Sequence, residues 1–354
     1  MITQVRIRRA INSKYWLYQK LAQGEYGKVY AAQDLRTGRL VAIKVQVDDE
    51  SKIARSEYKL LSRVSSPHIV RLIEGFCMRN LIYIVFPLYT CNLQQFLMNK
   101  KSVPLHMVIR LAYQLFRAVH ECHSKGIIHR DIKPSNIFLK NDRLVLGDFG
   151  LATNRRKNHD IEASTLWYRS PEALLNEYNY DEKVDIWAAA CVVGEMLTKG
   201  VPMFRSNCEI GQVFAIFSAL GTPEHLNMIH FSPSFPKWPR KPLRIVGTPT
   251  EFTDILQKCL VYSPNQRCSA AQACRAFVSF MQKYAQKSLP QTKHHESKGD
   301  PAPAGDQGDQ GDQGDRAPTG DQGDQGDKGD QGGRWDQRDR APTGDQGDQG
   351  DRAT

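Results

Sequence analysis

A short segment near the middle of the chain places charged and amide side chains between two apolar runs. Residues 127–139 read IIHRDIKPSNIFL, with Asp131, Lys133 and Asn136 close together in the polar part. Side chains of these types rarely occupy a core-like setting unless partners satisfy them. This segment is therefore the first candidate for a functional site.

Two further charged residues are expected to face inward. The stretch LVAIKVQV at 40–47 alternates as a strand does, and Lys44 lies on the face opposite its valine and isoleucine side chains. Residues 51–64 have the apolar spacing of a helix, and Glu57 falls on the apolar stripe. An acid that faces inward needs a cation, and Lys44 can pair with it.

Two glycine-containing segments complete the candidates. The stretch LAQGEYGKVY at 21–30 carries Gly24 and Gly27, which would let a hairpin approach phosphate oxygens. Alone, this pattern is equally well explained as a plain hairpin turn. The stretch LVLGDFG at 144–150 places Asp148 before a Phe-Gly pair, which in isolation is usually a turn.

Two parts of different character must position these residues. The first 90 or so residues read as strands plus one helix, whereas the apolar spacing beyond residue 92 is mostly helical. The two parts join near IVFPLYTCN at 84–92. We therefore expect a β-rich lobe followed by an α-rich lobe.

Taken together and in this order, the motifs resemble the signature set of the protein kinases. The resemblance covers residues 15–284. It implies an α+β, two-lobed protein kinase fold, with an N-lobe at 15–87, a hinge at 88–91 and a C-lobe at 92–284. It also implies ATP and Mg²⁺ as cofactors.

The resemblance assigns roles around the nucleotide. Lys44, fixed by Glu57, would neutralise the α- and β-phosphates. Asn136 and Asp148 would ligate Mg²⁺, a hard cation that favours oxygen donors. The other nucleotide contacts would come from five parts of the pocket: the glycine loop (Ala22, Gly24 and Gly27), the roof (Val29 and Ala42), the back (Phe86), the hinge (Leu88 and Tyr89) and the floor (Phe138).

The same resemblance assigns the transfer step. Asp131 would accept the proton of the substrate hydroxyl or orient that hydroxyl, and Lys133 would face the γ-phosphate and mark a Ser/Thr kinase. Thr165 would contact Asp131 and shape the substrate site. The alternative function is a pseudokinase scaffold that binds cyclin-like or other partners without phosphoryl transfer.

Later segments sharpen the resemblance to cyclin-dependent kinases. These are TLWYRSPE at 165–172, and FAIFSALGTPEHLNMI at 214–229 followed by PSFPKWP. They imply protein substrates phosphorylated on Ser or Thr, and proline-directed specificity. In the family Arg267 would pair with Glu172, and Asp185 would hold the backbone of the catalytic loop.

Several positions depart from that family. Ala22 replaces the first glycine of the phosphate loop. Asp160 stands where a threonine is phosphorylated, and of three receiving arginines Arg130 remains while Ser56 and Thr153 replace the others. One hypothesis is an Asp160–Arg130 contact that orders the activation segment without phosphorylation; the other is a solvated Asp160.

Regulation by partners and by phosphorylation is also altered. SKIARSE at 51–57 replaces the cyclin-contacting sequence, so the alternatives are an unusual cyclin, another activator or none. We expect a monomer or a heterodimer with an activator. Tyr26 matches an inhibitory tyrosine whose neighbouring threonine is here Glu25; an ordinary loop aromatic is an equally good interpretation.

Composition limits the other classes of function. No apolar run reaches about 18 residues, so no membrane span is expected. Eight scattered cysteines without a C-x-x-C pair indicate reduced thiols in an intracellular protein, in the cytoplasm, the nucleus or both. No basic-aromatic repeat or finger motif accompanies the basic charge, so no specific nucleic-acid site is expected.

The two ends of the chain are expected to lie outside the folded domain. Residues 1–14 read as a basic arm. Residues 285–354 read as a disordered tail, because its repeats of Gly, Asp and Gln contain almost no apolar side chains. Residues 299–354 carry a net charge of −8 and the rest of the chain +18, so the tail could contact the basic body.

Overall fold

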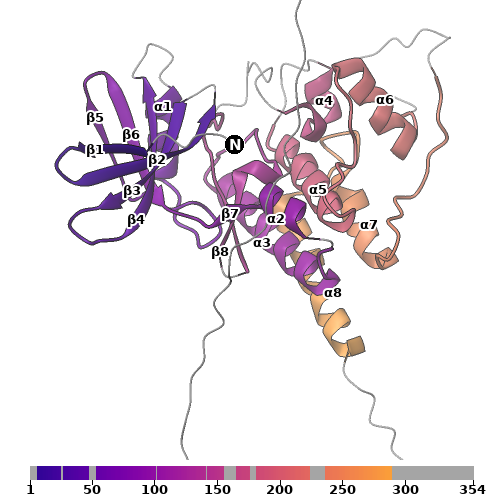
Figure 1. Ribbon diagram of the computed structural model, residues 1–354. Helices are drawn as coiled ribbons and strands as arrows, with labels where there is room; N and C mark the ends of the chain where they lie inside the picture. Colours follow the sequence, from indigo (N-terminus) through magenta and orange to yellow (C-terminus); the bar gives the residue numbers. More distant parts are fainter. Residues whose placement is uncertain are drawn as a thin grey trace, which may run out of the picture. The chain divides into compact units, whose positions relative to one another are not determined.

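A computed structural model describes residues 6–24, 27–47, 53–100, 102–140, 142–154, 165–175, 181–223 and 236–288. Its first part is a curled antiparallel sheet with one helix, and its second part is mostly helical (Figure 1). The expected α+β architecture, with a β-rich lobe before an α-rich lobe, is confirmed.

The N-lobe sheet places Lys44 in a strand that is paired on both edges. Its strands are β1 Arg6–Ile11, β2 Tyr15–Gly24, β3 Gly27–Asp34, β4 Leu40–Val47, β5 Glu74–Met78 and β6 Leu81–Pro87, in the spatial order β1-β2-β3-β4-β6-β5. Lys44 on β4 lies opposite Val29 on β3 and Ile84 on β6. Pairing on both sides fixes the backbone from which the Lys44 side chain extends.

The first strand corrects the expectation of a basic arm at residues 1–14. Arg6–Ile11 pairs with β2, and the amide of Lys14 donates a 3.1 Å hydrogen bond to the carbonyl of Ile11. Asn12 and Ser13, in the loop that joins the two strands, have φ angles of 52° and 50°, as the central residues of a type I′ turn do. Ile11 is buried in the N-lobe core, so the segment makes apolar contacts that its charged sequence did not predict.

The helix in the described part of the N-lobe is α1 Ile53–Leu61, which ends three residues before the end of the helix expected at 51–64. Ala54, Leu60 and Leu61 are buried, as the apolar stripe predicts. Glu57 on the same stripe is only 1% exposed. The helix therefore presents an acid to the interior of the lobe.

The C-lobe is built around a helix that is buried on all sides. The helices are α2 Leu93–Asn99, α3 Leu105–Ser124, α4 Pro171–Leu174, α5 Lys183–Leu197, α6 Glu209–Leu220, α7 Thr250–Cys259 and α8 Ala270–Ser288. Nearly every residue of α5 is buried, including Trp187, as expected of a helix that is apolar around its whole circumference. No helix in the described ranges is long and apolar enough to cross a bilayer.

Short elements of the C-lobe carry the polar motifs. Strands β7 Cys91–Asn92, β8 Ile137–Lys140 and β9 Arg143–Leu146 form a small sheet. The 3₁₀ turn η1 Pro134–Asn136 lies beside β7 of this sheet, and the 3₁₀ turn η2 Leu166–Tyr168 lies beside α5. Helix α8 continues to Ser288, four residues past the expected domain boundary at 284, because the helical sequence does not end there.

Candidate active site

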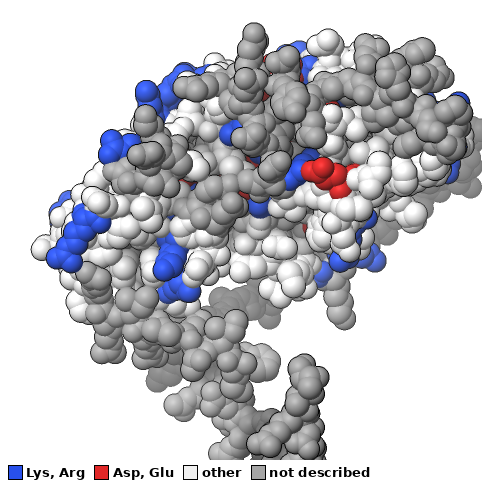
Figure 2. All heavy atoms as spheres, turned by 90° about the horizontal axis from the view of Figure 1, so that it is seen from above, with Lys and Arg blue, Asp and Glu red and all other residues white. Residues whose placement is uncertain are grey.

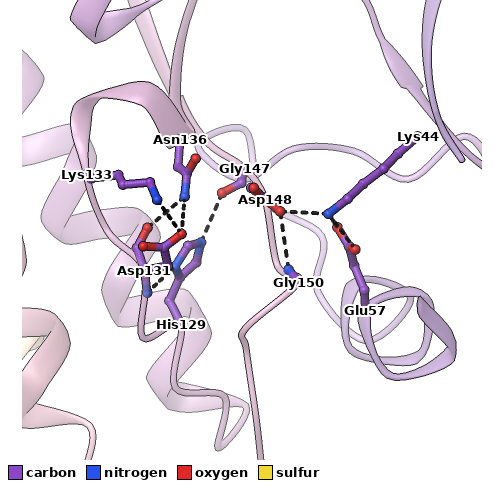
Figure 3. Close-up of polar contacts among 9 residues, drawn as sticks. All are labelled: Lys44, Glu57, His129, Asp131, Lys133, Asn136, Gly147, Asp148 and Gly150. Carbon is purple, nitrogen blue, oxygen red and sulfur yellow. Dashed lines mark hydrogen bonds and ion pairs between the residues drawn. The ribbon is translucent and has the colours of Figure 1, made fainter. Parts of the chain in front are cut away.

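Lys44 joins two carboxylates from different elements. Its Nζ lies 3.0 and 2.8 Å from the two carboxylate oxygens of Glu57 on α1, and 2.7 Å from Oδ1 of Asp148. Figure 3 shows Asp148 between this pair and a second polar cluster. The pairing expected between Lys44 and Glu57 is present, and Asp148 is a third member of the group.

The second cluster is the polar segment from which the sequence analysis began. The amide nitrogen of Asn136 donates to the backbone carbonyl of Asp131 at 2.9 Å and to its Oδ2 at 2.8 Å. Lys133 Nζ lies 2.9 Å from the same Oδ2 (Figure 3). Because the Asn136 nitrogen is used in this way, its amide oxygen is the atom that can serve a metal ion.

A buried histidine connects the two clusters. The amide of Asp131 donates to Nδ1 of His129 at 3.3 Å, so Nε2–H donates to the carbonyl of Gly147 at 3.0 Å. The His129 ring also packs edge-on against Phe149, with centroids 4.7 Å apart. These contacts hold the backbone on both sides of Asp148, whose φ is +55°.

Asp185 holds the backbone of the polar segment, the role that the kinase resemblance gave it. Its carboxylate accepts hydrogen bonds from the amides of His129 and Arg130, both at 2.8 Å, and lies 2.9 Å from Nε2 of His123. Arg130 has a φ of +66°, which is strained for a side chain of this size. Asp185, at the start of the buried α5, stabilises that conformation.

A cleft of about 550 Å³ opens between the glycine-containing hairpin and the polar segment. The sequence-predicted residues that line it are Ala22, Gly24, Gly27, Val29, Ala42, Lys44, Phe86, Leu88, Tyr89, Lys133, Asn136, Phe138 and Asp148. Glu57 lies behind Lys44 instead. A cleft of this size with mostly apolar walls and a few polar groups suits a small-molecule ligand.

The floor of the cleft is an aromatic pair supported by a glycine. The rings of Tyr89 and Phe138 stack with centroids 5.3 Å apart. Beneath them, a Cβ atom at Gly147 would lie 2.6 Å from the Phe138 ring. Position 147 therefore has no room for a side chain while Phe138 keeps this position.

Several lining residues were not predicted from the sequence, among them Leu21, Val70, Gln95 and Ser135. Leu21 and Ser135 are chain neighbours of predicted residues, so their place in the motifs could have indicated them. No motif marks Val70 or Gln95, whose positions depend on how distant segments pack.

Asp131 and Thr165 share a second, smaller pocket. Its lining also includes Tyr168, Arg169 and Ser170 from η2 and the residues after it. Thr165 and Asp131 therefore line the same pocket, and the contact expected between them stays a prediction. Residues of the TLWYRSPE segment form one side of this pocket.

Residues 15–278 match the family model described as protein kinase domain. The chain belongs to the protein kinase family. Two relatives from Trypanosoma brucei brucei sharpen this: cell division control protein 2 homolog 2 is 34% identical over 279 residues, covering 73% of this chain and 81% of the relative. Cell division control protein 2 homolog 3 is 36% identical over 274 residues, which cover 72% of this chain and 88% of the relative. The chain is a cyclin-dependent-kinase-like protein kinase.

The charges of the kinase cleft stabilise one another. Burial lowers the pKa of Lys44, but the negative charges of Glu57 and Asp148 outweigh it, and the pKa of the ammonium group is raised overall. Partial removal from water raises the pKa of Asp148, but the charge and hydrogen bond of Lys44 lower it overall. Both groups are therefore ionised at neutral pH.

The kinase C-lobe contains the expected tie between Glu172 and Arg267. The guanidinium group makes two parallel hydrogen bonds to the carboxylate, at 2.6 and 2.9 Å, and the two side chains are 2% and 0% exposed. Arg267 also donates to the carbonyls of Val261 and Lys183 at 2.9 and 2.8 Å. A buried charge pair is stable only with such additional hydrogen bonds.

Some regulatory predictions fall outside the described residues. These are Asp160, Glu25, Tyr26 and the tail beyond Ser288. Within the described part, Arg130 Nε donates to the carbonyl of Leu151 at 2.6 Å, and the backbone of Thr153 pairs with that of Ile128.

Figure 2 shows one face of the molecule, on which Lys and Arg side chains stand as separate groups.

Proposed function

We propose that this protein is an active kinase that transfers the γ-phosphoryl group of Mg²⁺-ATP to Ser or Thr hydroxyls of protein substrates. The observation that carries the proposal is that Lys44, Asn136 and Asp148 line one cleft, with the side-chain amide of Asn136 bonded to the carboxylate of Asp131 beside it. Phosphoryl transfer needs little covalent chemistry from a protein and depends mainly on positioning and charge compensation.

The donor set fits the expected ligands. Lys44 provides a fixed positive charge for the α- and β-phosphates, and the apolar roof and aromatic floor suit an adenine ring. Asn136 and Asp148 present an amide oxygen and a carboxylate, which are oxygen donors of the kind that Mg²⁺ prefers. Bound there, Mg²⁺ would offset the negative charge of the phosphates.

Different residues would serve different parts of the transfer step. Asp131 accepts the hydroxyl proton or orients the hydroxyl, and Asn136 and Lys133 fix its carboxylate. Lys133 also lines the cleft and, with ATP bound, would face the γ-phosphate. Ser/Thr specificity rests on Lys133, and proline-directed specificity rests on Thr165 and the adjoining TLWYR segment.

The state of α1 bears on the need for an activator. Glu57 on α1 contacts Lys44, and this ion pair must be in place in an active protein kinase. An unusual cyclin, another activator or no activator are the alternatives for what keeps α1 in this position. A peptide-array phosphorylation assay with and without added cyclins measures the kinase activity together with the preference for proline after the phosphorylated residue.

The main experiment compares catalytic variants with matched controls. The full chain is incubated with labelled ATP, Mg²⁺ and a basic protein substrate. Lys44→Met and Asp131→Asn should abolish labelling, whereas the exposed-residue controls Lys59→Met and Asp254→Asn should retain it. If the wild type and both site variants are equally silent with activators supplied, the scaffold function is favoured instead.

A further inference from the structure

Two cysteine sulfur atoms lie close together where α7 leads into α8. Cys259 is the last residue of α7, and Cys268 stands two residues before α8. Both are free thiols, and their Sγ atoms are 3.3 Å apart. A disulfide requires about 2.05 Å between sulfur atoms, so a shift of about 1.3 Å would join them.

The surroundings of this cysteine pair hold the two sulfurs in place. The amide of Cys268 donates to the carbonyl of Lys258 at 3.2 Å. Its chain neighbour Arg267 is fixed by Glu172, and Lys183 Nζ donates to the carbonyls of Arg267 and Pro264 at 2.5 and 3.1 Å. The loop between the cysteines therefore closes around a buried ion pair and keeps the thiols facing each other.

The two thiols are not equivalent. Cys259 is buried, whereas Cys268 is partly exposed and lies near the positive charges of Lys183 and Arg267. The contact with Cys259 and these two charges lower the pKa of Cys268, and the contact with Cys268 together with burial raises the pKa of Cys259. A partly exposed thiol of low pKa beside a second cysteine is the arrangement found in redox-sensitive sites.

We propose that Cys259 and Cys268 form a reversible disulfide when the protein meets hydrogen peroxide. The Cys268 thiolate attacks one peroxide oxygen, the O–O bond breaks, a sulfenic acid forms, and the leaving hydroxide takes up one proton from solvent to give water. The sulfur of Cys259 then attacks the sulfenic sulfur, the S–O bond breaks, and the departing hydroxide takes the Cys259 proton as a second water. The two thiols lose two electrons in total, and peroxide gains them; a small dithiol reverses the reaction.

The expected consequence is a more stable C-lobe in the oxidised form. The disulfide would close the loop that carries Arg267 and so reduce the freedom of the unfolded chain. Because Arg267 binds Glu172 in α4, the disulfide would secure the contact between α4 and the segment that follows α7. The effect is a change in stability and needs no kinase activity to be observed.

Peptide mass mapping tests the bond directly. The full chain is treated with hydrogen peroxide, remaining thiols are blocked with N-ethylmaleimide, and the protein is digested with trypsin. Cleavage after Lys258, Arg267 and Arg275 separates peptide 259–267 from 268–275. We expect a linked pair about 2 Da lighter than the two reduced peptides together, which dithiothreitol separates. Because Cys274 shares the second peptide, the digest is repeated on Cys274→Ser.

Thermal unfolding provides the second readout. Peroxide should raise the Tm of the wild type by several degrees, and dithiothreitol should reverse the rise. Cys268→Ser should remove both the linked peptide and the rise, whereas Cys208→Ser, at an exposed cysteine, should keep both. A linkage through Cys274, or oxidation of Cys268 to sulfinic acid without a linked peptide, would overturn the proposal, as would an unmodified Cys268 at a peroxide dose that oxidises Cys208.

Discussion

The phenol of Tyr168 donates a 2.7 Å hydrogen bond to the carboxylate of Glu195. Tyr168 belongs to η2 and lines the small pocket shared by Asp131 and Thr165, and Glu195 lies in the last turns of α5 and is 5% exposed. The bond therefore joins the TLWYRSPE segment to the central helix of the C-lobe. It also places an acid where water hardly reaches it.

This buried acid should make stability depend on pH. Burial raises the pKa of Glu195 to about 7, against the lowering effect of the Tyr168 hydrogen bond. The folded protein thus binds the Glu195 proton more tightly than the unfolded chain does. The contribution of protonated Glu195 to the free energy of unfolding is therefore complete below about pH 4.5 and is lost as pH rises through about 7. Glu195→Gln should therefore gain free energy of unfolding relative to wild type between pH 5 and 8, by about 2–3 kcal/mol.

Urea unfolding at pH 5 and pH 8 measures this difference. The control is Glu121→Gln, since Glu121 is partly exposed and pairs with Arg117 on the surface of α3. That variant should follow the pH dependence of the wild type. An identical pH dependence in Glu195→Gln and wild type would show that Glu195 is ionised in both states across this range.

Breaking the pair between Arg267 and Glu172 should cost far more than breaking a surface pair. Arg267→Met leaves a buried carboxylate without its cation, and we expect a loss of about 3–5 kcal/mol in the free energy of unfolding. Arg267→Lys should recover little of this lost free energy, because an ammonium group cannot make two parallel hydrogen bonds to the carboxylate. The control Arg110→Met removes an exposed ion pair with Asp142 and should cost less than about 1 kcal/mol. Equal losses in urea unfolding would contradict this distinction.

A side chain at Gly147 should push the floor of the cleft into the adenine site. Its Cβ would lie 2.6 Å from the Phe138 ring, and overpacking of this kind costs about 1–3 kcal/mol. Gly147→Ala should therefore lower both the Tm and the affinity for ATP, measured by calorimetry. The double variant with Phe138→Leu, which makes room, should recover part of both; a single variant that binds ATP normally would mean that the ring moves freely.

Removing the carboxylate of Asp185 should release the strained backbone of the catalytic loop. Asp185→Ala leaves the buried amide of His129 and the partly buried amide of Arg130 without their acceptor, and the loss at the buried amide alone costs about 1–3 kcal/mol. We expect a large fall in kcat, because Asp131 is no longer held in place, with less change in the KM for ATP. Asp185→Asn keeps an acceptor oxygen and should retain more activity. A change confined to KM would contradict the positioning role.

Much of the site could be predicted from local patterns. Strand alternation placed Lys44, helical spacing placed Glu57, and short motifs marked Asp131, Asn136 and Asp148; the structure brings these residues together. Each of these signals lies within a few residues of sequence. Lys44 and Glu57 had to be paired because a buried charge needs a partner, and this requirement holds whatever the details of packing.

Other features were decided only by the tertiary structure. The strand at Arg6–Ile11 looked like a charged arm until a turn and the edge of β2 gave it a partner. The contact between Cys259 and Cys268, the packing of Gly147 under Phe138 and the burial of Glu195 leave no periodic trace in the sequence. Sequence patterns report which face of an element is apolar, but the approach of individual side chains depends on how whole elements pack, and only the folded chain fixes that.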